Sequence, residues 1–274
     1  MTKKISLIIM FVITTLLSPL FLHACSCSPQ YPKLGVWWWN KDLDDSYLDF
    51  AYQNKVTEIY YCNSNFDSNT IDFLSKCNKK NISVYLLAGE KEWLNNTENL
   101  INIIEKYIQF QSSSKIKFSG IHLDIEPHQF DDFSENRYKY IYNLINIAHT
   151  LKTNYRDILF DYDIPFWLED NINFNNNNKP AYQHMIDIAN RVFVMSYRDT
   201  AESIYNVGKE EVEYAISSNK QLFLCVETKS SEGDNVSFME EGKEYMFSEI
   251  DKLRKLLPDN FGISIHHIKS WQEM

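Results

Sequence analysis

Eight short apolar runs recur along the chain, and segments with helical periodicity separate them. Each run has the length of a buried strand, and the segments between them carry apolar residues three or four positions apart, as in an amphipathic helix. Such alternation predicts a parallel sheet, because a return to a parallel strand needs a crossover connection. The predicted strands are 35–39, 57–62, 83–88, 120–126, 158–164, 192–197, 222–227 and 262–265.

Eight strand–helix units in one chain of this length predict a single-domain (β/α)8 TIM barrel over residues 35–274. A doubly wound open sheet is the alternative, but we find no Gly-rich phosphate loop to support it. The Asn-rich segment 171–178 is interpreted as a polar loop after the fifth strand. The predicted helices are 45–53, 70–77, 99–110, 136–152, 181–189, 210–218 and 238–257, and little chain follows the eighth strand.

The first 24 residues have the pattern of a secretory signal peptide. Two lysines precede an uncharged, mostly apolar run over 5–22, and Ala24 stands before Cys25. This ending resembles the lipobox of bacterial lipoproteins, in which the Cys is acylated. The resemblance implies lipidation at Cys25, a tether over 25–34 and a folded part outside the cytoplasmic membrane. A plain signal peptide or an uncleaved membrane anchor is the alternative.

Charge and cysteine usage narrow the range of partners. The chain has 27 Lys and Arg against 37 Asp and Glu, a formal net charge of −10. This balance argues against nucleic acid or an anionic membrane surface as a partner. Cys62, Cys77 and Cys225 lie in separate apolar runs and do not form the pattern of a disulfide framework. We expect a monomer without a cofactor.

The fourth predicted strand places its charged residues on one side. Alternation puts His122, Asp124 and Glu126 on one face and three apolar residues on the other. The two acidic residues lie about 7 Å apart along a strand that rises ~3.3 Å per residue. Three ionisable groups on one face are costly to bury in an apolar core. We therefore expect this face to reach the C-terminal mouth of the barrel, where active sites of this fold lie.

Polar and aromatic side chains also gather where the other predicted strands end, whereas the strand beginnings carry unremarkable residues. This difference between the two ends of the strands predicts an enzyme with a cleft at the C-terminal face. The alternative is a rim that is polar only for solubility. The substrate-binding candidates are Trp39, His122, His128, Asp161, Asp163, Tyr197, Arg198, His267 and Trp271.

Residues 119–126 resemble the strand-four signature of family 18 glycoside hydrolases, the chitinase group. Ser119 and His122 stand where that family has Asp, and Arg198 replaces an Asp that usually follows its Met-x-Tyr motif on strand six. The matching residues are Gly120, Ile121, Leu123, Asp124, Ile125, Glu126, Met195 and Tyr197.

The family 18 resemblance implies three catalytic roles. Glu126 would be the general acid, Asp124 would orient the acetamido group of the substrate, and Tyr197 would help to hold that group. In such a mechanism the acetamido group of the substrate itself attacks the sugar.

A second resemblance is to clan A retaining glycosidases, which carry the acid/base on strand four and the nucleophile on strand seven. Glu126 followed by Pro127, together with Glu227 at the end of the seventh predicted strand, resembles this pattern. It implies that Glu227 is a nucleophile. Retaining chemistry needs carboxyl groups about 5–5.5 Å apart and inverting chemistry roughly 6.5–9.5 Å. The alternative for Glu227 is a rim ion pair with Arg198.

The whole chain also resembles a group of uncharacterised bacterial barrel proteins, which supports the barrel but implies no reaction. The shared motifs in this sequence are residues 122–128, 163–167, 195–200, 227–228, 236–238, 241–242, 265–267 and 270–271.

Two other function classes stay open. A metal-dependent hydrolase could use His122, Asp124, Glu126, His128 and the His266-His267 pair, but no short His-x-His or His-Glu-x-x-His element is present. A non-catalytic glycan-binding lipoprotein is the other. We favour a glycoside hydrolase acting on a cell-wall or environmental glycan, without a bound metal.

Overall fold

The computed structural model describes residues 33–40, 44–63, 65–230 and 233–274. The signal peptide, Cys25 and most of the tether predicted from the sequence therefore lie outside the described residues. Within the described part, no helix is both long enough and apolar enough to cross a bilayer.

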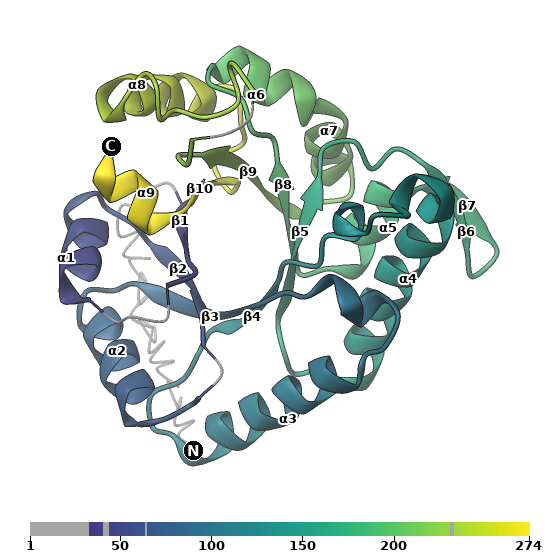
Figure 1. The fold of residues 1–274 in the computed structure, drawn as a ribbon, viewed down its shortest axis with the longest axis horizontal. Coiled ribbons are helices and arrows are strands. Elements are labelled where there is room, and N and C mark those ends of the chain that lie inside the picture. Colours follow the sequence, from purple (N-terminus) through teal and green to yellow (C-terminus); the bar gives the residue numbers. More distant parts are fainter. Residues whose placement is uncertain (1–32, 41–43, 64, 231–232) are drawn as a thin grey trace, which may run out of the picture. The chain divides into compact units, whose positions relative to one another are not determined.

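Eight parallel strands close into a barrel in the order β1-β10-β9-β8-β5-β4-β3-β2 (Figure 1). Neighbouring strands in this order are joined by parallel ladders around the whole circle. The (β/α)8 prediction is confirmed. The barrel strands are β1 (Lys33–Trp38), β2 (Glu58–Cys62), β3 (Ser83–Ala88), β4 (Gly120–Leu123), β5 (Phe160–Pro165), β8 (Arg191–Met195), β9 (Gln221–Glu227) and β10 (Gly262–His266).

Helices surround the barrel and cover its outer face (Figure 1). Their apolar stripes pack on the outward-facing residues of the strands and form the larger core. The helices are α1 (Asp45–Gln53), α2 (Ser68–Lys79), α3 (Glu98–Ser113), α4 (Phe133–Asn154), α5 (Ala181–Ile188), α6 (Ala201–Val207), α7 (Lys209–Ser217), α8 (Lys243–Arg254) and α9 (Ile268–Glu273), with 3-10 turns at Lys91–Leu94 and Pro127–Gln129.

The Asn-rich segment after β5 is a hairpin, not the polar loop predicted from the sequence. Strands β6 (Asn171–Phe174) and β7 (Asn177–Pro180) pair in antiparallel fashion. Both turn residues between them are Asn with positive φ, the conformation that a two-residue hairpin turn requires. Alternate residues of β6 are buried, so an apolar face lies among the amides.

The interior of the barrel holds a second, aromatic cluster. Trp37, Tyr60, Phe193 and Phe223 project inward from four strands and are almost completely buried. Gly262 makes room for them, because a Cβ there would lie 2.1 Å from the ring of Phe223. The cluster fills the middle of the barrel and forms the floor below the C-terminal mouth.

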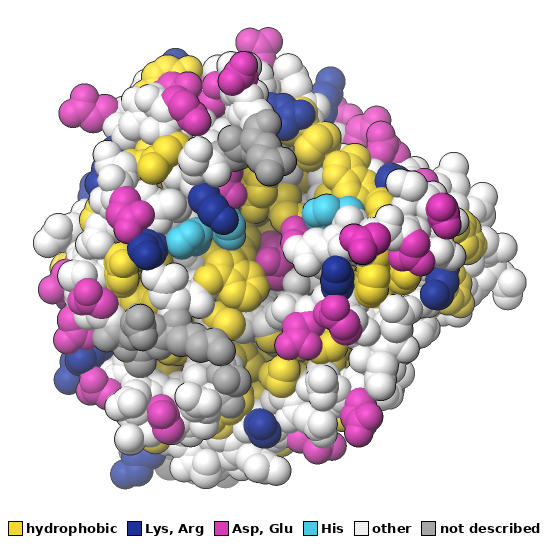
Figure 2. All heavy atoms as spheres, in the orientation of Figure 1, with side chains coloured by type: hydrophobic (Ala, Val, Ile, Leu, Met, Phe, Trp, Pro, Cys, Tyr) yellow, Lys and Arg dark blue, Asp and Glu magenta, His cyan; other side chains and the backbone are white. Residues whose placement is uncertain are grey.

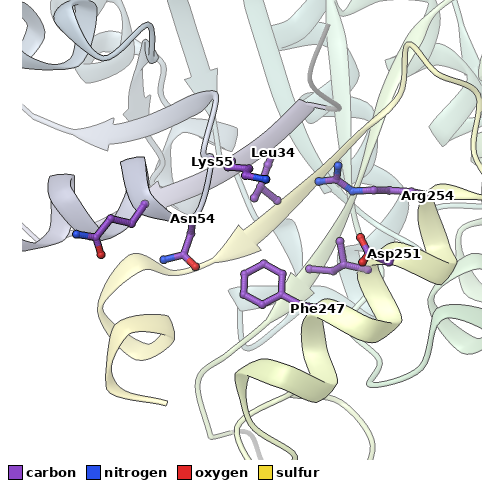
Figure 3. A pocket seen from close by; sticks show the side chains of 8 residues that line it. Leu34, Asn54, Lys55, Phe247, Asp251 and Arg254 are labelled. Carbon is purple, nitrogen blue, oxygen red and sulfur yellow. The ribbon is translucent and has the colours of Figure 1, made fainter. Parts of the chain in front are cut away.

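A cavity of about 420 Å³ lies between α1 and α8, beside the start of β1 (Figure 3). Figure 3 shows Phe247, Asp251 and Arg254 of α8 across from Asn54 and Lys55. Because β1 begins here, this cavity does not belong to the C-terminal mouth.

Candidate active site

The C-terminal ends of five neighbouring strands bring acidic and aromatic residues together. Asp124 follows β4, Asp163 lies in β5, Tyr197 follows β8, and Glu227 and His266 end β9 and β10. Electrostatic interactions connect all five of these groups. Figure 2 shows a hollow above the barrel, with apolar and acidic side chains inside it and His side chains at its rim.

Asp124 and Asp163 in the hollow each have one buried carboxyl oxygen without a hydrogen-bond partner among the described residues, and in Asp124 this oxygen is Oδ1. Burial, followed by the nearby charges of Asp163 and Glu126, raises the pKa of Asp124 well above its ordinary value. Gly89 lets β3 approach closely, because a Cβ at this position would lie 1.9 Å from the carbonyl oxygen of Asp124. A ligand could therefore supply the hydrogen bond that Asp124 Oδ1 lacks.

Glu126 interacts electrostatically with Asp124 but is more accessible. Its side chain keeps 21% of its surface exposed. Gln129 Nε2 donates a hydrogen bond to Glu126 Oε2, and His128 Nε2 lies 3.7 Å from Oε1. Pro127 follows and starts a 3-10 turn, which carries both partners back over the carboxylate. The carboxylate of Glu126 is thus positioned by its own loop and can still reach a substrate.

Asp163 connects the hollow with the aromatic floor. The indole N–H of Trp37 donates to Asp163 Oδ2 over 3.2 Å, and His122 Nε2 shares a 2.8 Å hydrogen bond with the same oxygen. His122 is fully buried and stacks on Tyr60, with 4.2 Å between ring centres. Burial lowers the pKa of His122 to about 3, so the ring is neutral. Burial also raises the pKa of Asp163 well above its ordinary value.

Glu227 is held by three donors. His266 Nδ1 lies 2.8 Å from Oε2, while the backbone N–H groups of Thr228 and Lys229 donate to Oε1 over 2.8 and 2.7 Å. Burial alone would lower the pKa of His266, but Glu227, Asp124 and Asp163 together raise it. Glu227 therefore pairs with His266 and not with Arg198, and both of its oxygens are engaged.

The remaining rim candidates surround the hollow. The ring of Tyr197 stacks on His266, with 6.1 Å between ring centres. The guanidinium of Arg198 lies 5.0 Å from the centre of the Phe166 ring. Trp39 packs against the aromatic floor. His128 meets the ring of Trp167 edge-on, and His267 accepts a hydrogen bond from Lys269 N–H at the start of α9.

Two candidates lie away from the hollow. Asp161 accepts hydrogen bonds from Arg191, the first residue of β8, near the opposite end of the barrel interior. Trp271 lies on α9 and is fully buried between Phe50 and Phe247. Neither side chain is accessible to a substrate in the hollow, because Asp161 is engaged in an ion pair and Trp271 is part of the helical core.

Sequence reasoning did not select Trp37 for the site, and it named His266 only as a possible metal ligand together with His267. Strand alternation contains a signal for both, because Trp37 is two residues from Trp39 and His266 is two residues from the inward-facing Ser264. Among the described residues, no group of three or more His, Cys, Asp or Glu side chains is arranged to hold a metal ion.

No family model and no curated protein matches the chain, but solved structures do. A chitinase from Bacteroides thetaiotaomicron aligns with a TM-score of 0.57 and 13% identity over 87% of this chain and 90% of that one. The spore cortex-lytic enzyme SleL of Bacillus megaterium QM B1551 aligns with a TM-score of 0.52 and 15% identity over 88% and 73%.

The glycoside hydrolase domain of PelA from Pseudomonas aeruginosa aligns with a TM-score of 0.50 and 7% identity, over 88% of this chain and 96% of that one. Identities this low establish a shared fold and do not establish a shared reaction. The chain is thus a single-domain TIM barrel whose fold resembles those of chitinases and spore cortex-lytic enzymes.

Proposed function

We propose that this protein is a glycoside hydrolase in which Glu126 is the general acid/base and Asp124 orients the substrate. One observation carries the proposal: at the C-terminal mouth, an accessible carboxylate lies beside a deeper carboxyl group whose Oδ1 is buried without a partner. A carboxyl pair in different environments can divide acid and orienting roles between its members. The fold similarity to chitinases agrees with this assignment.

The geometry favours a mechanism assisted by the substrate. The N–H of a substrate acetamido group would donate to Asp124 Oδ1 and supply its missing partner. The acetamido oxygen would then attack the anomeric carbon while Glu126 protonates the departing glycosidic oxygen. Water would later complete hydrolysis, with Glu126 accepting its proton.

Glu227 is the alternative nucleophile. Against this role, two backbone N–H groups and His266 occupy its oxygens. A nucleophilic Glu227 would have to give up part of this shell before attack. We therefore assign Glu227 the task of holding His266 next to Asp124 and Asp163.

Release of reducing ends from a panel of glycans, including peptidoglycan and N-acetylglucosamine polymers, tests the proposal. Glu126→Gln should lower the rate by at least about a hundredfold, the usual scale of a lost general acid. Glu213→Gln is a matched control, because Glu213 lies on α7 in an exposed ion pair with Lys209. Full activity of both Glu126→Gln and Glu227→Gln would exclude a glycosidase.

Glu227→Gln separates the two mechanisms. It should abolish hydrolysis if Glu227 is the nucleophile and only weaken it if the substrate acetamido group attacks. Tight glycan binding without turnover in the wild type would instead assign the chain to the non-catalytic binding class.

We further propose that the chain is a lipoprotein anchored through Cys25 and located outside the cytoplasm. The support is the apolar leader that ends at this Cys. Metabolic labelling with a radioactive fatty acid should mark the wild-type protein and leave Cys25→Ala unlabelled. Equal labelling of both would exclude acylation at this residue.

A further inference from the structure

Basic residues outnumber acidic ones at the N-terminal face of the barrel. We define this face by the segments that join a helix to the next barrel strand, which are 54–57, 80–82, 114–119, 155–159, 189–190, 218–220 and 255–261. Their basic residues are Lys55, Lys80, Lys115, Lys117, Arg156, Lys220 and Lys255, and their acidic residues are Asp157 and Asp259. The mouth has the reverse balance, because segment 124–132 carries acidic residues and neither Lys nor Arg.

Most of these basic residues have no acidic partner. Within the described ranges, only Lys80 of this set forms an ion pair, with Asp49. Helix dipoles favour basic residues at the C-terminal ends of helices, but the effect fades within the last turn. Lys115 and Lys117 are exposed and lie beyond the end of α3 at Ser113. Helix stability therefore does not account for the positive charge of this face.

Arg254 provides a second, independent observation at the same face. It ends α8 and points its guanidinium across the cavity of about 420 Å³ toward Lys55 and the start of β1 (Figure 3). Its Nε is buried and has no hydrogen-bond partner in the described part of the chain. Burial lowers the pKa of Arg254, although Asp251, which also lines the cavity, attracts its charge without forming an ion pair. A buried donor without a partner is costly, and an anion in the cavity would supply the partner.

The walls of this cavity indicate which anion it suits. Besides Asp251 and Arg254, the lining residues are Leu34, Gln53, Asn54, Lys55, Phe247 and Ile250. A guanidinium and an ammonium group together suit a phosphate group. The apolar side chains beside them suit the hydrocarbon that adjoins the phosphate of a phospholipid.

The length of chain before β1 limits how far this face can lie from a membrane anchor. Cys25 precedes Lys33, the first residue of β1, by eight positions. Such a stretch spans at most about 28 Å even when fully extended. Because β1 begins at the N-terminal face and ends at the mouth, an anchor at Cys25 would bring the N-terminal face to the membrane surface first.

We propose that the N-terminal face docks on an anionic phospholipid surface, with Arg254 binding one headgroup phosphate in the cavity. The inference rests on the proposed anchor at Cys25 for the location of the chain, and not on the proposed glycosidase activity. The net charge of −10 argues against such a partner only as an average over two faces of opposite charge. Docking would turn the mouth away from the bilayer, toward glycans outside it.

Hydrogen exchange of the protein in vesicles tests the docking. The full chain is expressed, purified in detergent and reconstituted into vesicles of phosphatidylcholine alone or of phosphatidylcholine mixed equally with phosphatidylglycerol. In the anionic vesicles, amides of 114–119 and 255–261 should exchange at least about fivefold more slowly, the effect of one Lys or Arg near an anionic surface. Segment 127–132 at the mouth should exchange equally in both, and high salt should remove the protection.

Charge variants show which residues are responsible. Lys115→Gln combined with Lys117→Gln should reduce the protection of the face by up to roughly twentyfold. Lys139→Gln combined with Lys209→Gln is the matched control, because it removes the same charge from exposed positions in the first half of α4 and at the start of α7. Arg254→Gln should remove protection from 255–261 and leave most of it at 114–119. An unchanged melting temperature in detergent shows that each variant is folded.

The outcomes separate the docking from the anchor. Equal exchange in both kinds of vesicle, by protein that floats with them, would overturn the docking and leave the anchor intact. If the wild type does not float with neutral vesicles, the anchor fails. Flotation with anionic vesicles alone, lost in the Lys115 and Lys117 variant, would then keep the docking, and flotation with neither would overturn it.

A different polyanion is the remaining alternative occupant. Equal protection of the same segments by RNA in solution, without vesicles, would assign the face to polyanions in general and overturn the lipid assignment. Reducing-end release by Glu126 is measured separately, so its absence would remove the glycosidase without affecting the docking.

Discussion

The two ends of the barrel interior use the same residue types in opposite ways. Near the start of the strands, Arg191 lies between Glu58 and Asp161, at 2.7 and 2.6 Å, and each carboxylate has its cation. At the C-terminal mouth, Asp124 and Asp163 interact unfavourably with each other, and Asp124 Oδ1 has no partner. Satisfied charges stabilise a fold, whereas unsatisfied ones mark a place where a ligand is expected.

The aromatic floor keeps these two environments separate. The rings of Tyr60 and Phe193 contact the imidazole ring of His122, while the guanidinium of Arg191 packs on the rings of Phe193 and Phe223. The ion network of Arg191, Glu58 and Asp161 and the hollow therefore contact the same aromatic side chains, and among the described residues no hydrogen bond joins the two. Substitutions at the two ends should have different consequences, which the following predictions order by size.

The largest effect is expected at the lower end. Arg191→Met leaves Glu58 and Asp161 buried without their cation and should lower the free energy of unfolding by about 3–5 kcal/mol. Denaturant unfolding at pH 7 measures the loss. Adding Glu58→Gln and Asp161→Asn should restore much of the stability, because the uncompensated charges are then absent. A fully stable Arg191→Met would show that the two ends do not differ in this way.

A smaller effect, an increase in the free energy of unfolding, is expected for Asp124→Asn. The raised pKa means that the folded protein holds a proton that the unfolded chain releases near pH 3.8, so this group lowers stability as pH rises. The Asn side chain cannot titrate, so the free energy of unfolding of the variant at neutral pH should be higher than that of the wild type by on the order of 1 kcal/mol. Thermal unfolding at pH 4 and pH 7.5 should show the gain growing with pH, while reducing-end release is lost. A pH-independent difference would contradict the assignment.

The smallest effect is expected for His128→Gln. His128 is exposed and lies 3.7 Å from Glu126, and pairs of this kind contribute roughly 0–1 kcal/mol. Stability should change by no more than this amount, and activity should fall modestly because Gln129 still holds the carboxylate. A loss of activity as large as that of Glu126→Gln would move His128 into the catalytic group.

The barrel could be predicted from the sequence because strands covered by helices and filled inside must be apolar on both faces. Alternation along the predicted strand 120–126 placed Asp124 and Glu126 at the C-terminal mouth, although β4 itself ends at Leu123, before both of them. The hairpin of β6 and β7 was missed because buried Ile172 and Phe174 are surrounded by Asn.

Strand alternation does not reveal how deep along the barrel axis an inward-facing side chain lies. Asp161 and Asp163 share the inner face of β5, yet the first reaches Arg191 and the second reaches Trp37. Likewise, the pairing of Glu227 with His266 depends on the register of β9 and β10, which brings residues 39 positions apart side by side.

Trp37 gives the site an optical signal of its own. Its indole N–H bonds to Asp163, and its ring lies 5.9 Å from that of His266. Both neighbours titrate, and both would respond to a ligand that reaches Asp124. The emission of this one buried indole, obtained as the difference between the wild type and Trp37→Phe, should therefore report occupancy of the cleft without any label.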